Sequence, residues 1–338
     1  VKRLRRVLKY NNVWLLVIDS HGINVWCAAA GGHMTHHELI GGIRVYALAD
    51  VVRHRTLIVP QLAATGIEKR LLERIGWKIK WGPARMEDLP DYLAGSGVGR
   101  SRRNIRFMRF PWWERIEMAV IWILPIFVVG ALIYLPLLGI QAALNFGLGV
   151  GLSITLLFLF LPVIKFSSAT ERKVGLRRFV FLAWSLVTAV GISLAYSIQT
   201  GFLLDWPPFV LAAGCLCAFV VLSIDFEGTT PWYGSVVARN KNPVDIALSE
   251  ERCTGTAQCV LVCPRDVFRM DGHRRKVMIT APGQCIQCGA CIVQCPEDAL
   301  YFKFADGKVI LPDVIRTTRL NLAGERSIVV GREYPGGD

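Results

Sequence analysis

Four long apolar runs in the middle of this chain constrain its fold more than any other feature of the sequence. They cover residues 117–138, 142–164, 180–197 and 206–224. Each run is close to the roughly 20 residues that an α-helix needs to cross the hydrocarbon core of a bilayer. A buried helical core in a soluble domain would need charged, amphipathic faces, which these runs lack. The sequence therefore predicts a four-helix transmembrane domain over residues 113–226.

Basic residues are distributed unevenly around these runs. Lys and Arg fill the segment before the first run and the loop after the second, whereas the other two loops have neither. The residues concerned are Arg100, Arg102, Arg103, Arg106, Arg109, Arg115, Lys165, Arg172, Lys173, Arg177 and Arg178. By the positive-inside rule these segments and both termini face the cytoplasm. We expect a multi-pass protein of the inner (cytoplasmic) membrane, with both soluble domains cytoplasmic. Because this topology explains much of the net charge of +13, nucleic acid is not an expected partner.

The apolar runs contain few polar side chains, which favours an anchor over a transporter or a proton channel. Gly147, Gly149 and Gly151 are spaced like part of a nucleotide-binding loop. The strand-turn-helix context of such a loop is missing, so the spacing favours close packing between membrane helices.

A run of four cysteines near the C-terminus carries the clearest chemical signal. Cys285, Cys288, Cys291 and Cys295 have the spacing C-x2-C-x2-C-x3-C, with Pro296 immediately after. This is the ligand run of bacterial iron–sulfur proteins, in which three thiolates hold one cluster and the fourth ligates a second. An imperfect copy lies upstream as Cys253, Cys259 and Cys263, followed by Pro264, with Thr256 where another cysteine would fall. The pattern predicts an α+β dicluster ferredoxin domain over residues 248–305, after a linker at 227–247 and before a tail at 306–338.

In proteins with two such runs, the last cysteine of each run ligates the cluster of the other run. This rule assigns the seven cysteines to two clusters. Cys263, Cys285, Cys288 and Cys291 are expected to hold one [4Fe-4S] cluster. Cys253, Cys259 and Cys295 hold the other, which is either [3Fe-4S] or [4Fe-4S] with a labile ligand, because the Thr256 hydroxyl stays protonated and binds iron poorly. A zinc ribbon is disfavoured, since it needs two separated C-x2-C pairs. The cluster thiols must stay reduced, which again indicates the cytoplasm.

Residues 1–112 predict an α/β domain with a Rossmann-like order of elements. Strands are expected at 13–19, 55–59 and 77–81, and helical patterns at 35–52 and 66–75. Strands that alternate with helices are typical of a layered sheet. The chain begins at Val1 rather than Met, so we expect that residues upstream are missing.

One cysteine in this domain lies where an extended segment gives way to a helix. Asn24, Val25 and Trp26 precede Cys27, and Ala28 and Ala29 follow it. A helix N-terminus favours a thiolate. From the residues alone, a buried small hydrophobe is favoured over a nucleophile or a soft-metal ligand.

These residues resemble the corrinoid protein of microbial mercury methylation and, more distantly, the corrinoid iron–sulfur protein of the acetyl-CoA pathway. The segments that carry the resemblance are 14–19, 22–29, 54–62, 82–85 and 88–90, followed by a multi-span membrane domain. In that family the partner is a separate dicluster ferredoxin, so the chain resembles the two proteins fused. The resemblance implies that Cys27 is the lower axial ligand of a corrinoid cobalt. It further implies that Asn24, Val25, Trp26, Ala28 and Ala29 shape the cap helix below the corrin ring.

The chain departs from the family pattern in three places. Gly and Lys follow the two alanines in the family, whereas Ala30 and Gly31 stand here. His33, His36 and His37 follow, for which a solvated polar face is favoured over a metal site. The partner ferredoxin of the family has further cysteines near its C-terminus, and this chain has none after Cys295. Those thiols are the expected carriers of soft Hg(II).

Two classes of function follow. In the first, a membrane-anchored corrinoid iron–sulfur protein transfers a methyl group to an electrophilic acceptor, Hg(II) or a related one, and the ferredoxin domain reduces the cobalt. A methyl-donor protein of one-carbon metabolism and a cytoplasmic electron donor are then the expected partners. In the second, the chain is a membrane-bound ferredoxin-type electron-transfer protein with a degenerate corrinoid domain. The cobalt content of the protein separates the two.

Overall fold

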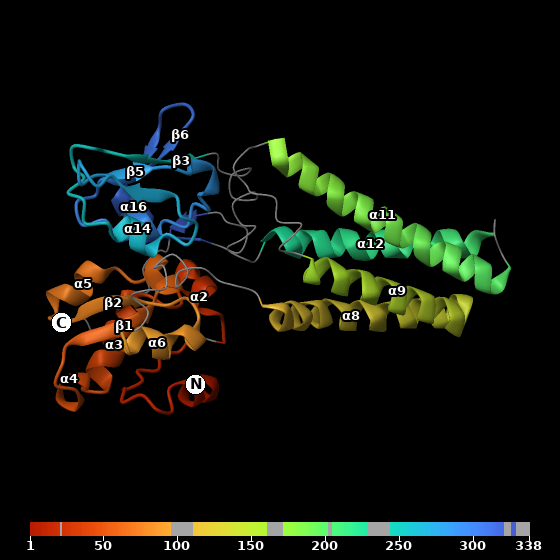
Figure 1. The fold of residues 1–338 in the computed structure, drawn as a ribbon, viewed down its shortest axis with the longest axis horizontal. Helices are drawn as coiled ribbons and strands as arrows, with labels where there is room; N and C mark the ends of the chain where they lie inside the picture. The colour runs from red at the N-terminus through yellow and green to blue at the C-terminus, as the bar shows by residue number, and fades with distance from the viewer. Residues whose placement is uncertain are drawn as a thin grey trace. The chain divides into compact units, whose positions relative to one another are not determined.

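The computed structural model describes residues 1–20, 22–95, 111–160, 172–201, 205–228, 244–320 and 326–328. The chain divides into two compact units, Val1–Met108 with Thr230–Asp338, and Arg109–Thr229 (Figure 1). The first unit therefore combines the two ends of the chain, and the second holds the apolar helices. We call the described residues up to 95 the N-terminal domain, and those from 244 onward the C-terminal domain.

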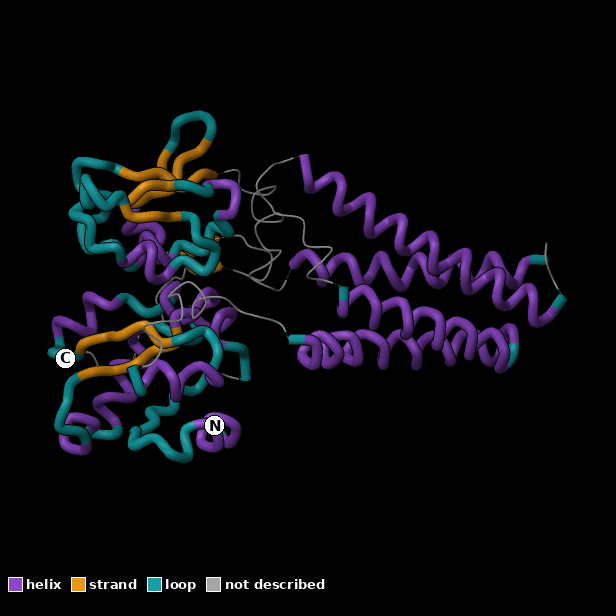
Figure 2. Tube along the Cα trace, viewed as in Figure 1, coloured by secondary structure: helices purple, strands orange, loops and turns teal. Residues whose placement is uncertain are grey.

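The N-terminal domain packs short helices around a two-stranded parallel sheet (Figure 2). Strand β1 (Thr56–Pro60) pairs with β2 (Lys78–Gly82), and the chain between them forms the 3-10 helix η1 (Gln61–Thr65) and α5 (Lys69–Arg74). Both strands confirm the sequence prediction to within one residue. The remaining elements are α1 (Lys2–Val7), α2 (Val25–Gly31), α3 (His36–Val45), α4 (Leu48–Val51), η2 (Met86–Asp88) and α6 (Leu89–Leu93).

The strand expected at 13–19 was wrong. This segment makes no strand pairing, although its side chains alternate as in a strand: Leu16 and Ile18 pack against the core, whereas Trp14 is 69% exposed. The inward side chains pack on α3. Ile18 lies directly over Gly42 of this helix, where an added Cβ would be only 2.7 Å from Ile18 Cδ1. The apolar run therefore serves as a cover over a helix. A Rossmann-like sheet is not confirmed, since the described sheet has two strands.

The helix expected at 35–52 breaks in its middle. Helix α3 begins with a capping box, in which Thr35 and Glu38 bond each other's backbone amides, and ends at Val45. Ala47 then adopts a left-handed conformation with φ of 43° before α4 starts. The helix expected at 66–75 is shortened to α5.

The described residues of the second unit form the helices α8 (Trp112–Leu138), α9 (Ile140–Leu159), α11 (Arg172–Thr200) and α12 (Trp206–Gly228). Among the described residues, three stretches are long and apolar enough to cross a membrane: Trp112–Leu138, Ile140–Leu159 and Phe181–Thr200. In α12 the apolar stretch Trp206–Leu222 is shorter, so the four-span count stays a prediction. Most of the basic residues that set the predicted orientation, at 100–109 and at 165, lie outside the described residues. The same holds for most of the predicted linker.

Large side chains of neighbouring helices pack directly against glycines of α9. A Cβ on Gly147 would lie 2.4 Å from the Phe127 ring, and one on Gly149 would lie 2.5 Å from Ile192. Tyr134 is buried beside α12 and donates a hydrogen bond to the Val210 carbonyl at 3.1 Å. The glycine spacing therefore serves helix packing, as the sequence indicated.

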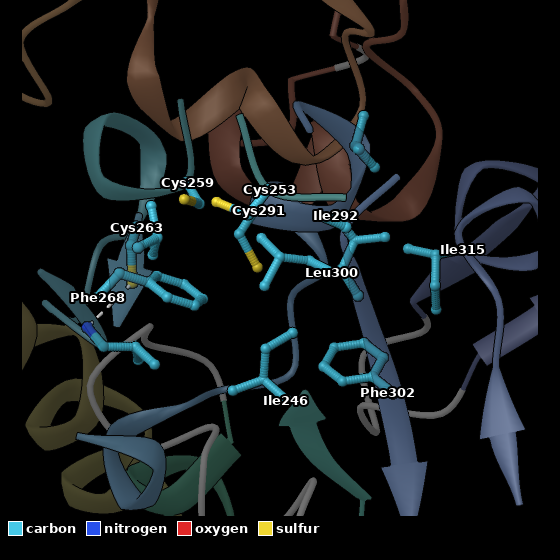
Figure 3. Packing of buried hydrophobic residues seen from close by; sticks show 14 of the residues in the cluster. Ile246, Cys253, Cys259, Cys263, Phe268, Cys291, Ile292, Leu300, Phe302 and Ile315 are labelled. Carbon is cyan, nitrogen blue, oxygen red and sulfur yellow. Dashed lines mark hydrogen bonds between the residues drawn. The ribbon is translucent and has the colours of Figure 1, made fainter. Parts of the chain in front are cut away.

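The C-terminal domain surrounds one buried core with short strands and helices. Its three-stranded antiparallel sheet has the order β3-β6-β7, and β4-β5 and β8-β9 are antiparallel pairs. The strands are β3 (Val244–Leu248), β4 (Phe268–Met270), β5 (Val277–Ile279), β6 (Leu300–Phe304), β7 (Val309–Ile310), β8 (Thr318–Leu320) and β9 (Arg326–Ile328). The helices are α14 (Gln258–Val262), η4 (Pro282–Gln284), α15 (Ala290–Val293) and α16 (Pro312–Thr317). Figure 3 shows Ile292, Leu300, Phe302 and Ile315 with the cysteines of this core.

Candidate functional site

Four cysteines of the C-terminal domain line one pocket. They are Cys263, Cys285, Cys288 and Cys291, the set that the spacing assigns to a single cluster. Backbone amides support two of the sulfur atoms: Val267 N donates to Cys263 Sγ at 3.5 Å, and Gln287 N donates to Cys285 Sγ at 3.4 Å. Such N–H···S contacts stabilise a thiolate and tune the potential of a cluster.

The other three cysteines line a second pocket of similar size. Cys253, Cys259 and Cys295 surround it together with Thr256, and each pocket has about 310 Å³ of empty volume. Ala299 N donates to Cys295 Sγ at 3.3 Å. Gly255 has a φ of 74°, and a Cβ there would lie 1.9 Å from the Arg275 carbonyl oxygen. The loop between Cys253 and Cys259 can therefore take this path only with glycine at position 255.

Burial makes two of these thiols, those of Cys259 and Cys291, poor acids in the absence of metal. It raises the pKa of Cys259 to about 12, with a smaller contribution from Cys295. Burial likewise raises the pKa of Cys291 well above its usual range, with Cys285 and Cys288 adding to the effect. A coordinated metal deprotonates a thiol outright, because its positive charge offsets this cost. A bound cluster would therefore hold Cys259 and Cys291 as thiolates despite their burial.

The seven cysteines of the C-terminal domain lie in the walls of these two pockets. In the described part of the chain, no three His, Cys, Asp or Glu side chains converge on a point that could hold one metal ion. Tetrahedral zinc, with Zn–S bonds of about 2.3 Å, would draw four sulfur atoms to within about 3.8 Å of each other. A pocket with cysteines around its wall suits a larger inorganic core.

The cysteine of the N-terminal domain lies in the first turn of α2. Asn24 is the N-cap of this helix, and its Oδ1 accepts a hydrogen bond from Cys27 N at 2.9 Å. The helix therefore starts at Val25, so that Val25 and Trp26 are helical and half-buried. Ala28 and Ala29 are fully buried, whereas Cys27 is half-buried. The helix presents its thiol near the surface and packs its two alanines inward.

Helix α2 packs against η1, and the backbones approach closely there. A Cβ on Gly66 would lie 2.5 Å from the Met34 carbonyl oxygen and 2.6 Å from that of Ala29. In η1 itself, Gln61 is 2% exposed, and neither atom of its amide has a hydrogen-bond partner in the described part of the chain. Thr65 Oγ1 is also buried without a partner there. Buried polar atoms are rarely left unpaired, so η1 is a place where a polar ligand would find hydrogen bonds.

The comparisons with known proteins agree with the arrangement of the cysteines. Residues 252–299 match the model of the 4Fe-4S dicluster domain. A ferredoxin of Methanothermococcus thermolithotrophicus is 33% identical over 60 residues, which cover 17% of this chain and 97% of that protein. Through this domain the chain belongs to the ferredoxin family. A dicluster ferredoxin domain implies two four-iron clusters, which the two pockets would hold.

The N-terminal domain is similar to a different group of proteins. Residues 8–93 match the model described as CO dehydrogenase/acetyl-CoA synthase delta subunit. The acetyl-CoA decarbonylase/synthase complex subunit gamma of Methanopyrus kandleri is 33% identical over 87 residues, 26% of this chain and 19% of the relative. Subunit gamma 2 of Methanosarcina thermophila is 35% identical over 82 residues, 24% of this chain and 17% of the relative. The chain thus spans less than a fifth of the length of these subunits. No solved structure matches the chain.

The chain therefore joins a domain similar to a corrinoid iron–sulfur protein family to a ferredoxin domain. The sequence predicted the cysteines but did not indicate Gln61 or Thr65. It also did not indicate Gln294, whose side chain bonds the backbone of Ala64 and Lys69. One signal for Gln61 was present, since it is a polar residue inside the apolar run 57–64. Gln294 gave no such signal, because its partners lie 225 or more residues away in the sequence.

Proposed function

We propose that this chain is a membrane-anchored corrinoid iron–sulfur protein that transfers a methyl group to an electrophilic acceptor. The observation that carries the proposal is the combination, in one compact unit, of α2 with its half-buried Cys27 and a ferredoxin domain with two cysteine pockets. The chemistry a bound corrinoid would supply is that of a cobalt–carbon bond. Acceptors to test begin with Hg(II) and extend to other soft electrophiles.

The residues present fit such a cofactor. Cys27 would be the lower ligand, because its side chain is half-buried in the first turn of α2 while Asn24 fixes its backbone amide. The buried Ala28 and Ala29 keep α2 against η1. The unpaired amide of Gln61 and hydroxyl of Thr65 supply hydrogen bonds for a ligand rich in amide groups. All of these residues lie within the matched region 8–93.

The ferredoxin domain supplies single electrons in this scheme. The Cys263 pocket would hold a four-iron cluster, and the Cys253 pocket either a three-iron cluster or a four-iron cluster with a labile ligand near Thr256. We further propose that the apolar helices cross the inner (cytoplasmic) membrane, with both domains of the first unit in the cytoplasm. There they would meet a methyl-donor protein of one-carbon metabolism and a soluble electron donor.

Metal analysis and absorption spectra of anaerobically purified, corrinoid-reconstituted protein test the proposal. We expect about one cobalt per chain, and a corrin spectrum that changes in Cys27→Ala. The matched control is Cys217→Ala, which removes an exposed thiol from α12 and should change neither the spectrum nor the iron content. Iron without cobalt in all three proteins would overturn the proposal and leave the membrane-bound ferredoxin.

A further inference from the structure

Within the first unit, the ferredoxin domain and the N-terminal domain share an interface built around one buried glutamine. Gln294 lies between the cluster ligands Cys291 and Cys295 and is 4% exposed. Its Nε2 donates to the carbonyl oxygens of Ala64 at 2.8 Å and Ile67 at 2.6 Å, and its Oε1 accepts from Lys69 N at 3.3 Å. One side chain thus binds three backbone groups at the end of η1 and the start of α5.

Charged residues extend the interface on the same side. Glu68 is 8% exposed and accepts from Arg70 at 2.7 and 2.9 Å. Arg316, at the end of α16, places its Nε 3.6 Å from Glu68 and pairs with Asp298 in its own domain. Arg70 in turn donates to the Pro296 carbonyl oxygen at 3.3 Å. Each domain therefore brings both signs of charge, and buried ion pairs of this kind depend on their geometry to be favourable.

An apolar contact beside Gln294 brings a cluster ligand to the same element. Ala64 of η1 is fully buried against Val262 and Ala290 of the ferredoxin domain, and Cys288 packs against this group. On the N-terminal side, η1 also packs against α2 through Gly66 and Ala29. A single short element therefore separates the four-cysteine pocket from the helix that carries Cys27.

We propose that residues 61–69, from η1 to the first residue of α5, form a fixed docking surface through which the ferredoxin domain transfers electrons. Gln294 is the positioning residue that keeps the ferredoxin domain on this surface, which we call the seat. A buried amide that bonds three backbone groups of the other domain fits a fixed contact and not a transient one. A reduced cluster held by Cys263, Cys285, Cys288 and Cys291 would pass one electron across the seat to a one-electron acceptor on the N-terminal domain, and a soluble one-electron donor would reduce the cluster again. The identity of the electron acceptor rests on the proposed function, whereas the seat does not.

Hydrogen exchange in the full-length protein tests the seat by itself. Gln294→Met keeps the length of the side chain and removes its three hydrogen bonds. Leaving buried partners unpaired costs roughly 1–3 kcal/mol, so exchange of the Lys69 amide and of peptides over residues 61–69 should accelerate roughly tenfold to hundredfold. The matched control is Asp271→Ala, which removes bonds to His273 N and Arg274 N inside the ferredoxin domain and should leave the seat unchanged. Unaltered exchange in Gln294→Met would overturn the proposal.

Electron transfer tests the role of the seat. In corrinoid-loaded protein reduced with dithionite, Gln294→Met should slow reduction of the cobalt more than twofold, while the iron content and the EPR signals of both clusters stay those of the wild type. Equal rates in Gln294→Met and wild type would refute the positioning role. If no corrinoid binds, the proposed function fails, and the exchange result still decides whether the seat exists.

Discussion

Replacing Gly66 by alanine probes the contact between the cap helix and the seat. The φ of Gly66 is −109°, so an alanine there has no backbone strain, and its effect comes from packing alone. The added Cβ would lie 2.5 Å from Met34 O and 2.6 Å from Ala29 O, where about 3.4 Å is the normal limit. Both neighbours are backbone atoms, one in α2 and one in the turn that follows it, so neither can rotate away as a flexible side chain could. Overpacking of this kind costs about 1–3 kcal/mol.

A gain from the unfolded state opposes this cost. Exchange of glycine for alanine stabilises a protein by about 0.4–1 kcal/mol where the site accepts it. We therefore expect Gly66→Ala to lower the free energy of unfolding of the N-terminal domain by about 1–2 kcal/mol. The matched control is Gly41→Ala in α3, where a Cβ would meet nothing within 4 Å. That variant should instead be stabilised, since alanine is favoured over glycine in a helix by about 0.5–1 kcal/mol.

Hydrogen exchange of peptides over 24–34 and 56–66, measured for both variants in the full-length protein, decides between these expectations. We expect faster exchange in Gly66→Ala and equal or slower exchange in Gly41→Ala. Equal stability of the two variants would refute the reasoning, because it would mean that α2 is not held against η1 at the observed distance. In corrinoid-loaded protein, Gly66→Ala should also change the absorption spectrum, since α2 carries Cys27.

Three further predictions concern a cluster, a pH dependence and the unpaired glutamine. Gly255→Ala should lower the iron content by up to half and remove the EPR signal of the Cys253 pocket, because its Cβ would meet Arg275 O, whereas Gly272→Ala in the β4-β5 turn should keep both clusters. Burial, with a contribution from His37, lowers the pKa of His36 below 6.5, so the unfolded state takes up a proton that the folded state resists. Stability should therefore be complete above pH 6.5 and fall as the pH drops below it, and chemical unfolding of His36→Gln should show a flatter profile. Gln61→Leu should stabilise the apoprotein by about 1–3 kcal/mol in denaturant titrations yet release corrinoid more readily on gel filtration, and unchanged retention would exclude Gln61 as a ligand contact.

Local patterns in the sequence predicted the parts of the site that local chemistry determines. The spacing of Cys285, Cys288 and Cys291 with Cys263 gives the same four residues that line one pocket. Cys27 was placed where an extended segment gives way to a helix, and it lies in the first turn of α2. Strands β1 and β2 followed from short apolar runs. In each case the residues that cause the structure lie within a few positions of each other.

The remainder depends on contacts that no window of sequence contains. The run at 13–19 has the alternation of a strand, and only its packing over Gly42 of α3 shows that it covers a helix instead. The tail after residue 305 gave no functional signal, yet Ile315 is buried in the core of the ferredoxin domain and Arg316 reaches Glu68. These roles follow from tertiary neighbours, which override local propensity.

The covalent connection between the two domains determines how a loss of Gln294 should appear. A tethered ferredoxin domain has an effective concentration on the order of 1 mM at the seat. A binding free energy of about −4 kcal/mol between the two is therefore enough for half of the molecules to have the domain bound there. With a binding free energy of about −7 kcal/mol, the domain would be bound at the seat in more than about 99% of molecules. Losing about 3 kcal/mol of that free energy would lower the bound fraction only to about half. If the interaction is about −7 kcal/mol or stronger, weaker affinity alone therefore slows electron transfer by at most about twofold, whereas an interaction of about −4 kcal/mol would be almost completely lost and electron transfer would slow far more. Hydrogen exchange of residues 61–69 in the wild-type protein separates these cases, because only the stronger interaction keeps them protected. With the stronger interaction, a decrease of more than about twofold in Gln294→Met would mean that the ferredoxin domain binds in a different position, which changes the path between the Cys263 pocket and η1.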